Sequence, residues 1–281
     1  MDKIISIDIK ADFGFLKKPD TNDPIYLTFN MLHKPALLGI LGAILGLQGF
    51  SEARKNERKG KRKIEKQTLN QGELLPEYYQ KLKDLKIGIQ PLRFIENEQN
   101  EFELDKSFNG NFEKTIIKYN NGVGYANLDG GNLIVVEQTL IKPNYRCYIL
   151  VGDDSQLYDC LKHSKAEYLP YLGKNDFSLW WNNFSEHNFS LFHSAEDFQL
   201  SSIFIKEETL KDGKKKQAAF NPSGNFSGNK FMYFENLPVA YNTDLMQYEY
   251  QPFAYTNWDL KQTYKVDNLY KLSSDEIIQL F

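Results

Sequence analysis

The first residues of the chain alternate between apolar and polar positions. In KIISIDIKADFGF, residues 3–15, a polar side chain recurs at every second position from Ser6 to Lys10, and isoleucines stand between them. A period of two sends successive side chains to opposite faces, as in a strand with one buried face. The pattern therefore predicts that the chain opens with a strand whose isoleucines face a core.

A glycine-laced apolar run follows a short loop, in LTFNMLHKPALLGILGAILGL, residues 27–47. Pro35 stands where a helix would begin, and a proline in the first helical turn removes no hydrogen bond. Gly39, Gly42 and Gly46 recur at spacings of three and four residues. We expect a buried helix that can lie very close to a sheet, and these glycines fit helix packing and a ligand role equally well.

The next part of the chain alternates between helical and extended patterns. The expected helices are ELLPEYYQKLKDL and SQLYDCLKHSK, the second capped by Ser155, and the expected strands are KIGIQPLRF, LIVVEQTLI and NYRCYILVG. When the polar, glycine-rich insert at about 95–132 is set aside, this order is compatible with a ferredoxin-like β–α–β–β–α–β unit. RNA-recognition modules use the same sheet.

The second half, from about residue 176, is rich in Trp, Phe and Tyr and has no long amphipathic helix. We therefore expect an α+β fold. Residues 1–175 would form a ferredoxin-like, RNA-recognition-like domain with an insertion at about 95–132. Residues 176–281 would form a smaller, mostly β C-terminal region.

Within the insert, KYNNGVGYANLDGGN (118–132) has the turn signals Asn121-Gly122 and Gly130-Gly131 on either side of Tyr125. Asn-Gly is a strong hairpin signal, so we expect a protruding hairpin or glycine-rich flap. The glycines do not have the spacing of the common phosphate-binding loops, which argues against a nucleotide-binding loop.

Composition and charge narrow the class of protein. The 281 residues are 41% hydrophobic and carry a formal net charge of −3, as expected for a globular protein. Cys147 and Cys160 lack metal-ligand spacing and are interpreted as buried free thiols. We expect a cytoplasmic protein, because no signal peptide and no membrane-spanning run is present. The basic run 51–66 suits contact with a phosphate backbone on one face, although a solvated basic helix is the simpler interpretation.

Catalytic signatures are scarce. None of the four histidines lies in a metalloprotease, nucleophile-elbow or metal-ligand pattern. His33-Lys34 and Lys162-His163 could act as acid/base pairs in RNA cleavage, but a histidine beside a helix end is more often a cap or a surface residue. Nothing in the sequence compels an enzyme, and we expect no metal and no cofactor.

Several motifs in order resemble a known family. These are FGFLKKP, PALLGILGAILGL, YYQKLKDLKIGIQPL, LIKPNYRCYI and YLPYLGKNDF. Together they resemble the Cas-five family of the RAMP superfamily, with the type I-B-like branch as the nearest fit, over about residues 3–176. The resemblance implies a domain with a protruding thumb hairpin that binds the 5′ handle of CRISPR RNA in the Cascade complex. It also implies contacts with the Cascade backbone and large subunits, and with target DNA only through the complex.

The resemblance further implies where RNA would bind. The glycine-laced helix and the preceding LTFNMLHK segment should face the handle, the 95–132 insert should be the thumb, and the loop EYLPYLGKNDF (167–177) should stand beside the sheet. We expect at least one of Tyr168 and Tyr171 to pack this loop down. The expected RNA-binding residues are Lys17, Lys18, Thr28, Asn30, His33, Lys34, Lys118, Tyr119, Asn120, Tyr125, Asn127, Arg146, Tyr171, Lys174 and Asn175.

Two functions of different class remain open at this point. The first is a non-catalytic RNA-binding subunit, which we favour because no convincing catalytic cluster is present. The second is a metal-independent endoribonuclease of the same superfamily that processes precursor CRISPR RNA, using His33 or His163 with a neighbouring lysine or tyrosine.

Overall fold

The computed structural model describes most of the chain. The described residues are 2–19, 24–51, 75–97, 99–121, 133–152, 155–209, 214–217, 222–223, 230–242, 244–264 and 266–281. The basic run from residue 52 onward and the hairpin tip with Tyr125 and Asn127 lie outside them. No helix within the described residues is long and apolar enough to cross a membrane.

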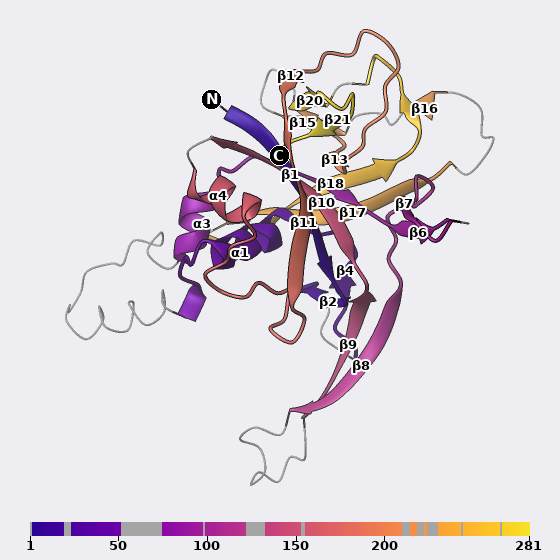
Figure 1. Cartoon of the computed structure of the whole chain (residues 1–281). Helices are drawn as coiled ribbons and strands as arrows, with labels where there is room; N and C mark the ends of the chain where they lie inside the picture. Colours follow the sequence, from indigo (N-terminus) through magenta and orange to yellow (C-terminus); the bar gives the residue numbers. More distant parts are fainter. Residues whose placement is uncertain are drawn as a thin grey trace.

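A four-stranded antiparallel sheet forms the centre of the molecule, in the order β11-β1-β10-β5 (Figure 1). Its strands are β1 (Asp2–Ala11), β5 (Ile87–Pro91), β10 (Asn144–Gly152) and β11 (Leu179–His187). The alternation predicted for the first strand is confirmed. Ile5, Ile7 and Ile9 face the main core, while Ser6 and Asp8 lie on the opposite face, across from Tyr148 and Arg146.

In the described part of the chain, three short helices lie beside this sheet: α1 (Lys34–Ile44), α3 (Glu77–Leu82) and α4 (Gln156–Lys162). The predicted helix starts are confirmed, because Pro35 lies in the first turn of α1 and Ser155 caps α4 through its hydroxyl. Leucines of α1 and α4, among them Leu37 and Leu161, pack with the isoleucines of β1 in one core.

The glycines in and just after α1 do not serve the close approach to a sheet that the sequence suggested. A Cβ on Gly42 would collide with Tyr78 of α3, and a Cβ on Gly46 would press on Glu167. A Cβ on Gly39 would meet the Tyr78 ring only at 4.0 Å, an ordinary contact. Gly42 therefore permits close packing of two helices, and Gly46 permits packing of the 167–177 loop.

The remaining strands of the first half form hairpins around the sheet. They are β2 (Phe13–Gly14), β3 (Leu16–Lys17), β4 (Thr28–Phe29), β6 (Phe94–Glu96), β7 (Phe102–Leu104), β8 (Lys114–Asn121) and β9 (Leu133–Ile141). The long β8–β9 pair extends away from the body of the molecule (Figure 1). At its base, β9 also pairs with β2.

The C-terminal region is built from antiparallel strands, as its aromatic composition predicted. They are β12 (Phe189–Leu191), β13 (Phe204–Ile205), β14 (Glu207–Thr209), β15 (Lys215–Gln217), β16 (Pro222–Ser223), β17 (Met232–Asn242), β18 (Gln247–Thr256), β19 (Asp259–Leu260), β20 (Leu269–Leu272) and β21 (Ile277–Gln279). Most of these strands are short, apart from the long pair β17–β18. The protein is thus mostly β, with several small antiparallel sheets and few helices.

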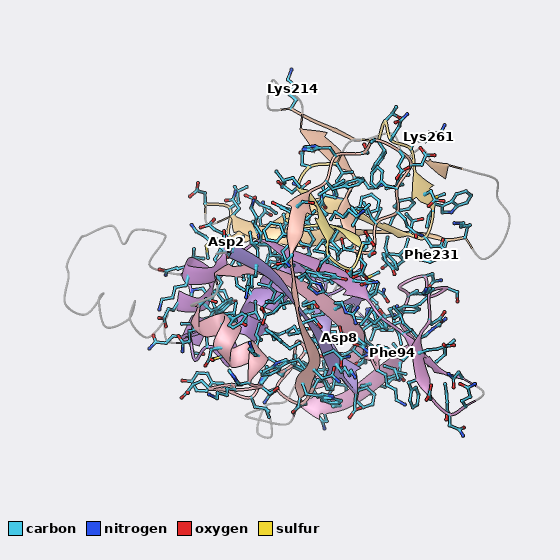
Figure 2. All side chains as sticks on the ribbon, turned by 45° about the horizontal axis from the view of Figure 1, so that its top comes forward. Asp2, Asp8, Phe94, Lys214, Phe231 and Lys261 are labelled. Carbon is cyan, nitrogen blue, oxygen red and sulfur yellow. The ribbon has the colours of Figure 1, made fainter. Side chains whose placement is uncertain are left out.

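The two halves of the chain share the main core. The central sheet takes its fourth strand, β11, from beyond residue 175, and Ile203, Leu237 and Phe253 pack in the same core as β1. The expected division between residues 175 and 176 therefore passes between α4 and β11. Figure 2 shows Asp8 inside the body, whereas Lys214 and Lys261 lie on the outer part of the C-terminal region.

Candidate functional site

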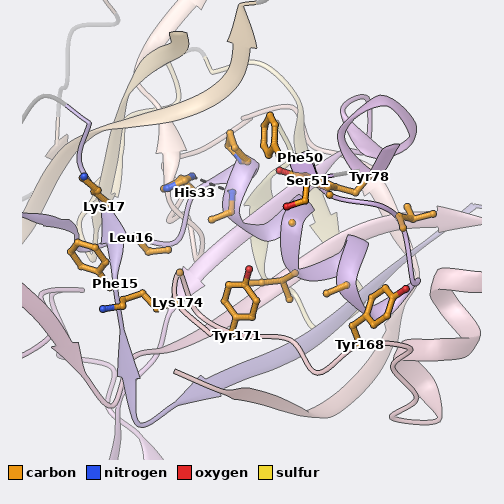
Figure 3. A pocket seen from close by; sticks show the side chains of 18 of the residues that line it. Phe15, Leu16, Lys17, His33, Phe50, Ser51, Tyr78, Tyr168, Tyr171 and Lys174 are labelled. Atoms are coloured by element: carbon orange, nitrogen blue, oxygen red, sulfur yellow. Dashed lines mark hydrogen bonds between the residues drawn. The ribbon is translucent and has the colours of Figure 1, made fainter. Parts of the chain in front are cut away.

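An open groove of about 890 Å³ lies between α1, the 167–177 loop and the segment that carries β2 and β3 (Figure 3). The groove is lined by Phe15, Leu16, Lys17, His33, Pro35, Ala36, Gly39, Ile40, Ala43, Leu47, Gln48, Gly49, Phe50, Ser51, Tyr78, Glu137, Tyr168, Leu169, Tyr171, Gly173, Lys174 and Tyr248. Two motifs that are far apart in the sequence, the glycine-laced helix and the aromatic loop, thus line one concave surface.

The 167–177 loop is fixed to the body at its centre. Leu172 is fully buried in the main core, and its carbonyl accepts a hydrogen bond from the Phe15 N–H at 3.1 Å. Gly173 has a φ of +85°, and a Cβ at this position would overlap the Phe15 carbonyl oxygen. Only glycine fits such a close approach of two backbones at a positive φ. The loop therefore has a fixed shape although it contains no helix and almost no strand.

The same loop completes the C-terminal end of α1. The N–H groups of Glu167 and Tyr168 donate to the carbonyls of Ile44 and Ala43, at 3.0 and 3.1 Å. The last carbonyls of a helix have no partner within the helix, so these bonds satisfy groups that would otherwise need water. Helix and loop therefore form one continuous wall of the groove.

Six of the lining residues are Phe or Tyr. Tyr168 is 56% exposed and Tyr171 46% exposed, so the expectation that at least one of them packs the loop down is wrong. Both lie along the groove, with Phe50 and Tyr78 on the opposite side of α1 (Figure 3). Burial raises the pKa of Tyr78 to about 12, so its hydroxyl stays protonated at neutral pH. Flat, partly exposed rings of this kind offer stacking surfaces.

Among the residues that the structure describes, two cations line the groove. Lys17 lies over the ring of Tyr26, with its Nζ 3.9 Å from the ring centroid. Lys174 binds the Glu137 carboxylate at 2.7 Å and the Tyr119 hydroxyl at 3.2 Å, which connects the loop to the β8–β9 hairpin. Burial alone would lower the pKa of Lys174, but these hydrogen bonds outweigh burial and the pKa is raised. Lys174 is therefore charged at neutral pH.

His33 is the N-cap of α1. Its Nδ1 accepts a hydrogen bond from the Ala36 N–H at 3.3 Å, and its side chain is almost completely buried. Burial lowers the pKa of His33 to about 3. The ring is therefore neutral at physiological pH, and a capping nitrogen cannot also serve as a general base. His163, the other candidate, caps α4 at its C-terminal end, near Asp159, and does not line the groove.

Some expected contact residues are used inside the fold. The Thr28 hydroxyl accepts from the Leu16 N–H and so joins β3 to β4. The Asn30 amide donates to the Gly110 carbonyl and accepts from the Phe112 N–H and Lys114. Both side chains are buried and fully engaged. Thr28 thus fixes β3, which carries the groove-lining residues Leu16 and Lys17, whereas Asn30 fixes the segment at the start of β8.

Three expected cations have partners within the protein. Lys18 lies 3.4 Å from Glu235, Lys34 donates to the backbone oxygen of Phe281, and Arg146 makes two hydrogen bonds to the buried Asp8. None of the three lines the groove. Of the expected phosphate-binding cations, the structure brings Lys17 and Lys174 together at this surface.

The remaining expected residues lie toward the hairpin and the loop tip. Lys118, Tyr119 and Asn120 are exposed on β8, and Asn175 is exposed at the tip of the 167–177 loop. Tyr125 and Asn127 lie outside the described residues.

Sequence reasoning missed several lining residues, among them Phe15, Phe50, Tyr78, Glu137 and Tyr248. Phe15 belongs to the FGFLKKP motif, so the sequence indicated its neighbourhood but not its place in the groove. Tyr248 comes from the C-terminal region, and no local pattern connects it with α1.

No family model and no curated protein matches this sequence. Among solved structures, the chain is similar to a protein described as a "CRISPR RNA-guided surveillance complex", with 8% identity, 96% of this chain and 92% of the other covered, and a TM-score of 0.44. It is also similar to "a CRISPR protein from Archaeoglobus fulgidus", with 10% identity, 99% and 98% covered, and a TM-score of 0.46. A chain of the "Type III-B Cmr-beta bound to cognate target RNA and AMPPnP" has 9% identity, 92% and 86% covered, and a TM-score of 0.41.

Proposed function

We propose that this protein is a non-catalytic RNA-binding subunit of a type I CRISPR Cascade complex, of the Cas-five kind and closest to type I-B. It would hold the 5′ handle of CRISPR RNA in the groove. The observation that carries the proposal is that the two motifs most distinctive of the resemblance, PALLGILGAILGL and YLPYLGKNDF, line the same groove.

The chemistry of the groove suits single-stranded RNA. Proteins bind unpaired strands with aromatic surfaces for the bases and cations for the backbone. Tyr168, Tyr171 and Phe50 are partly exposed along the groove, and Lys17 and Lys174 lie at the same surface. Because the wall is fixed by backbone hydrogen bonds, little ordering would be needed when RNA binds.

The proposal also assigns roles to the central sheet and to the β8–β9 hairpin. The order β1–α1–β5–β10–α4–β11 with the sheet order β11-β1-β10-β5 agrees with a ferredoxin-like, RNA-recognition-like unit. The β8–β9 hairpin would be the thumb and would contact the first Cascade backbone subunit. The Cascade large subunit would bind a different surface of this protein. Target DNA would be contacted only through the assembled complex.

The position of His33 argues against cleavage of precursor RNA by this chain. A neutral, buried histidine whose Nδ1 caps a helix is not available for proton transfer at that nitrogen. Incubation of the purified protein with end-labelled CRISPR repeat RNA in EDTA separates the two functions. Intact RNA supports the binding subunit, and a discrete product would establish the endoribonuclease.

The binding proposal is tested by crosslinking in the organism that carries the gene. The tagged protein is crosslinked to RNA with ultraviolet light, purified, and its RNA is sequenced. We expect fragments with a common 5′ end that comes from a CRISPR repeat, and far fewer crosslinks for a Tyr171→Ala variant. RNA without repeat sequence would contradict the proposal.

The electrostatic part of binding is tested by salt dependence. Each phosphate contact to a single strand adds roughly 0.7 to the slope of log K against log salt. Replacing Lys17 and Lys174 together by Ala should therefore lower the slope by roughly 1.4. The matched control changes Lys3 and Lys271 to Ala, which removes the same charge away from the groove. Equal slopes for the two double variants would show that RNA uses another surface.

A further inference from the structure

The His33 ring has a fixed arrangement of hydrogens. Its Nδ1 accepts a hydrogen bond from the Ala36 N–H, and a nitrogen that accepts carries no hydrogen. In a neutral imidazole the hydrogen must then be on Nε2. The helix cap thus selects one tautomer, in which Nε2 is a donor.

The donor faces the groove. His33 is 7% exposed and lines the groove wall between α1 and Lys17 (Figure 3). Within the part of the chain that the structure describes, no group accepts a hydrogen bond from Nε2. The ring is held edge-on against Phe29, with centroids 5.2 Å apart, and 6.5 Å from the ring of Tyr248. A ligand that displaces water from this donor must supply an acceptor in its place, so such a ligand binds better than one that leaves the donor unpaired.

We propose that the Nε2–H of His33 selects the bound RNA by donating to an acceptor atom on the edge of an unpaired nucleobase. This inference rests on the proposed function, because it names what one residue reads in that groove.

A base edge fits this donor better than a phosphate does. Phosphate oxygens are matched best by charged donors, and Lys17 and Lys174 supply these at the same groove. His33 is neutral and lies against the rings of Phe29 and Tyr248, so the ring itself offers an anion no charge to offset the hydration that the anion loses. A carbonyl oxygen or ring nitrogen of a base carries no such cost.

The donor also rejects some bases. A base that places an amino group opposite Nε2–H would bring two donors together and leave both unpaired. Sites built on a fixed hydrogen bond discriminate against such partners more strongly than sites built on apolar contact alone. His33 is therefore expected to govern base preference, with stacking on the tyrosines contributing to affinity for every base.

The tautomer is tested by NMR of the full-length protein carrying ¹⁵N-labelled histidine, with His33 assigned by loss of its signals in a His33→Asn variant. We expect the Nε2-protonated pattern at pH 7. The Nδ1-protonated pattern, or a doubly protonated ring, would overturn the inference before any RNA is added.

Recognition is tested with four single-stranded RNA octamers, one for each base, added to the same labelled protein. With the preferred octamer, the Nε2 signals should move and the Nε2 hydrogen should exchange more slowly with water. In affinity measurements His33→Ser should weaken the preferred octamer by about tenfold and reduce the spread among the four, since the variant loses the hydrogen bond that reads the base. Serine is a good N-cap, so α1 keeps its start. His163→Ser serves as the control outside the groove.

The outcomes separate the inference from the proposed function. Octamers that bind with sensitivity to Tyr171→Ala but without effect on the His33 signals or on His33→Ser would overturn the inference and leave RNA binding standing. Failure of all four octamers to bind would overturn both.

Discussion

The wall formed by α1 and the 167–177 loop differs from the β8–β9 hairpin in how each is held. The wall is tied to the core by the fully buried Leu172 and by backbone bonds on both sides. The hairpin is two strands paired mainly with each other, and Ile116 and Ile134 on one of its faces are 45% and 65% exposed.

This difference suggests different modes of action. A surface already fixed in shape binds with little loss of conformational entropy, which favours selectivity for its ligand. A two-stranded hairpin has little core of its own and gains stability from what it contacts. We therefore expect the wall to recognise RNA in the isolated protein, and the hairpin to act mainly in an assembly.

The largest effect should follow from breaking the shape of the wall. Gly173→Ala places a Cβ against the Phe15 carbonyl at a positive φ, so we expect a loss of about 3 kcal/mol or more in the free energy of unfolding. Gly49→Ala is the matched control, because its added Cβ meets nothing within 4 Å. Urea unfolding of both variants gives the comparison. Equal stability would show that the loop can move without cost and that the wall is not fixed.

The pH dependence of stability offers the next test of the wall. In the folded protein the His33 ring stays neutral down to about pH 3, whereas in the unfolded chain it protonates below about pH 6.5. Below pH 6.5 the unfolded state therefore binds more protons, and stability falls as pH falls. Between pH 7.5 and 5 the wild type should lose about 2 kcal/mol more than His33→Ser. Parallel urea titrations at both pH values measure this, and equal losses would mean that His33 is solvated in the fold.

Much of this architecture could be predicted from local pattern. The alternation in residues 3–15, Pro35 and Ser155 are short-range signals, and each fixes an element that the structure contains. Such signals operate within one strand or one helical turn, where the backbone preferences of a few residues decide the outcome.

The roles of single side chains were harder to predict, for a physical reason. Asn30 and Arg146 are polar residues near motifs of interest, but their partners Gly110 and Asp8 are distant in sequence. A polar residue in a sequence can face a ligand or satisfy a buried group, and only the tertiary structure distinguishes the two. The same holds for Tyr248, which reaches the groove from β18.

A moderate effect on stability is expected for the contact between the 167–177 loop and the β8–β9 hairpin. Lys174 and Glu137 form an ion pair in which the carboxylate is 7% exposed. A double-mutant cycle of Lys174→Ala and Glu137→Gln should give a coupling of about 1 kcal/mol, because the pair is partly buried and hydrogen-bonded. The control cycle uses Lys271 and Asp275, an exposed pair on which we expect less than about 0.5 kcal/mol. A coupling no larger than that of the control would show that the wall and the hairpin are not connected through Lys174.

The smallest effect on stability should come from the exposed face of the hairpin. Ile134→Ser removes an apolar side chain that is already mostly in water, so the free energy of unfolding should change by no more than about 0.5 kcal/mol. The same change, combined with Ile116→Ser, should weaken co-purification with the other subunits of the proposed complex, while binding of RNA to the isolated protein stays unchanged. Leu172→Ala provides the contrast, since truncating a fully buried leucine side chain lowers the free energy of unfolding by about 2–5 kcal/mol. The double serine variant could instead lose RNA binding but assemble normally. The hairpin would then be part of the RNA site, and the assignment of RNA recognition to the wall and of assembly to the hairpin would be wrong.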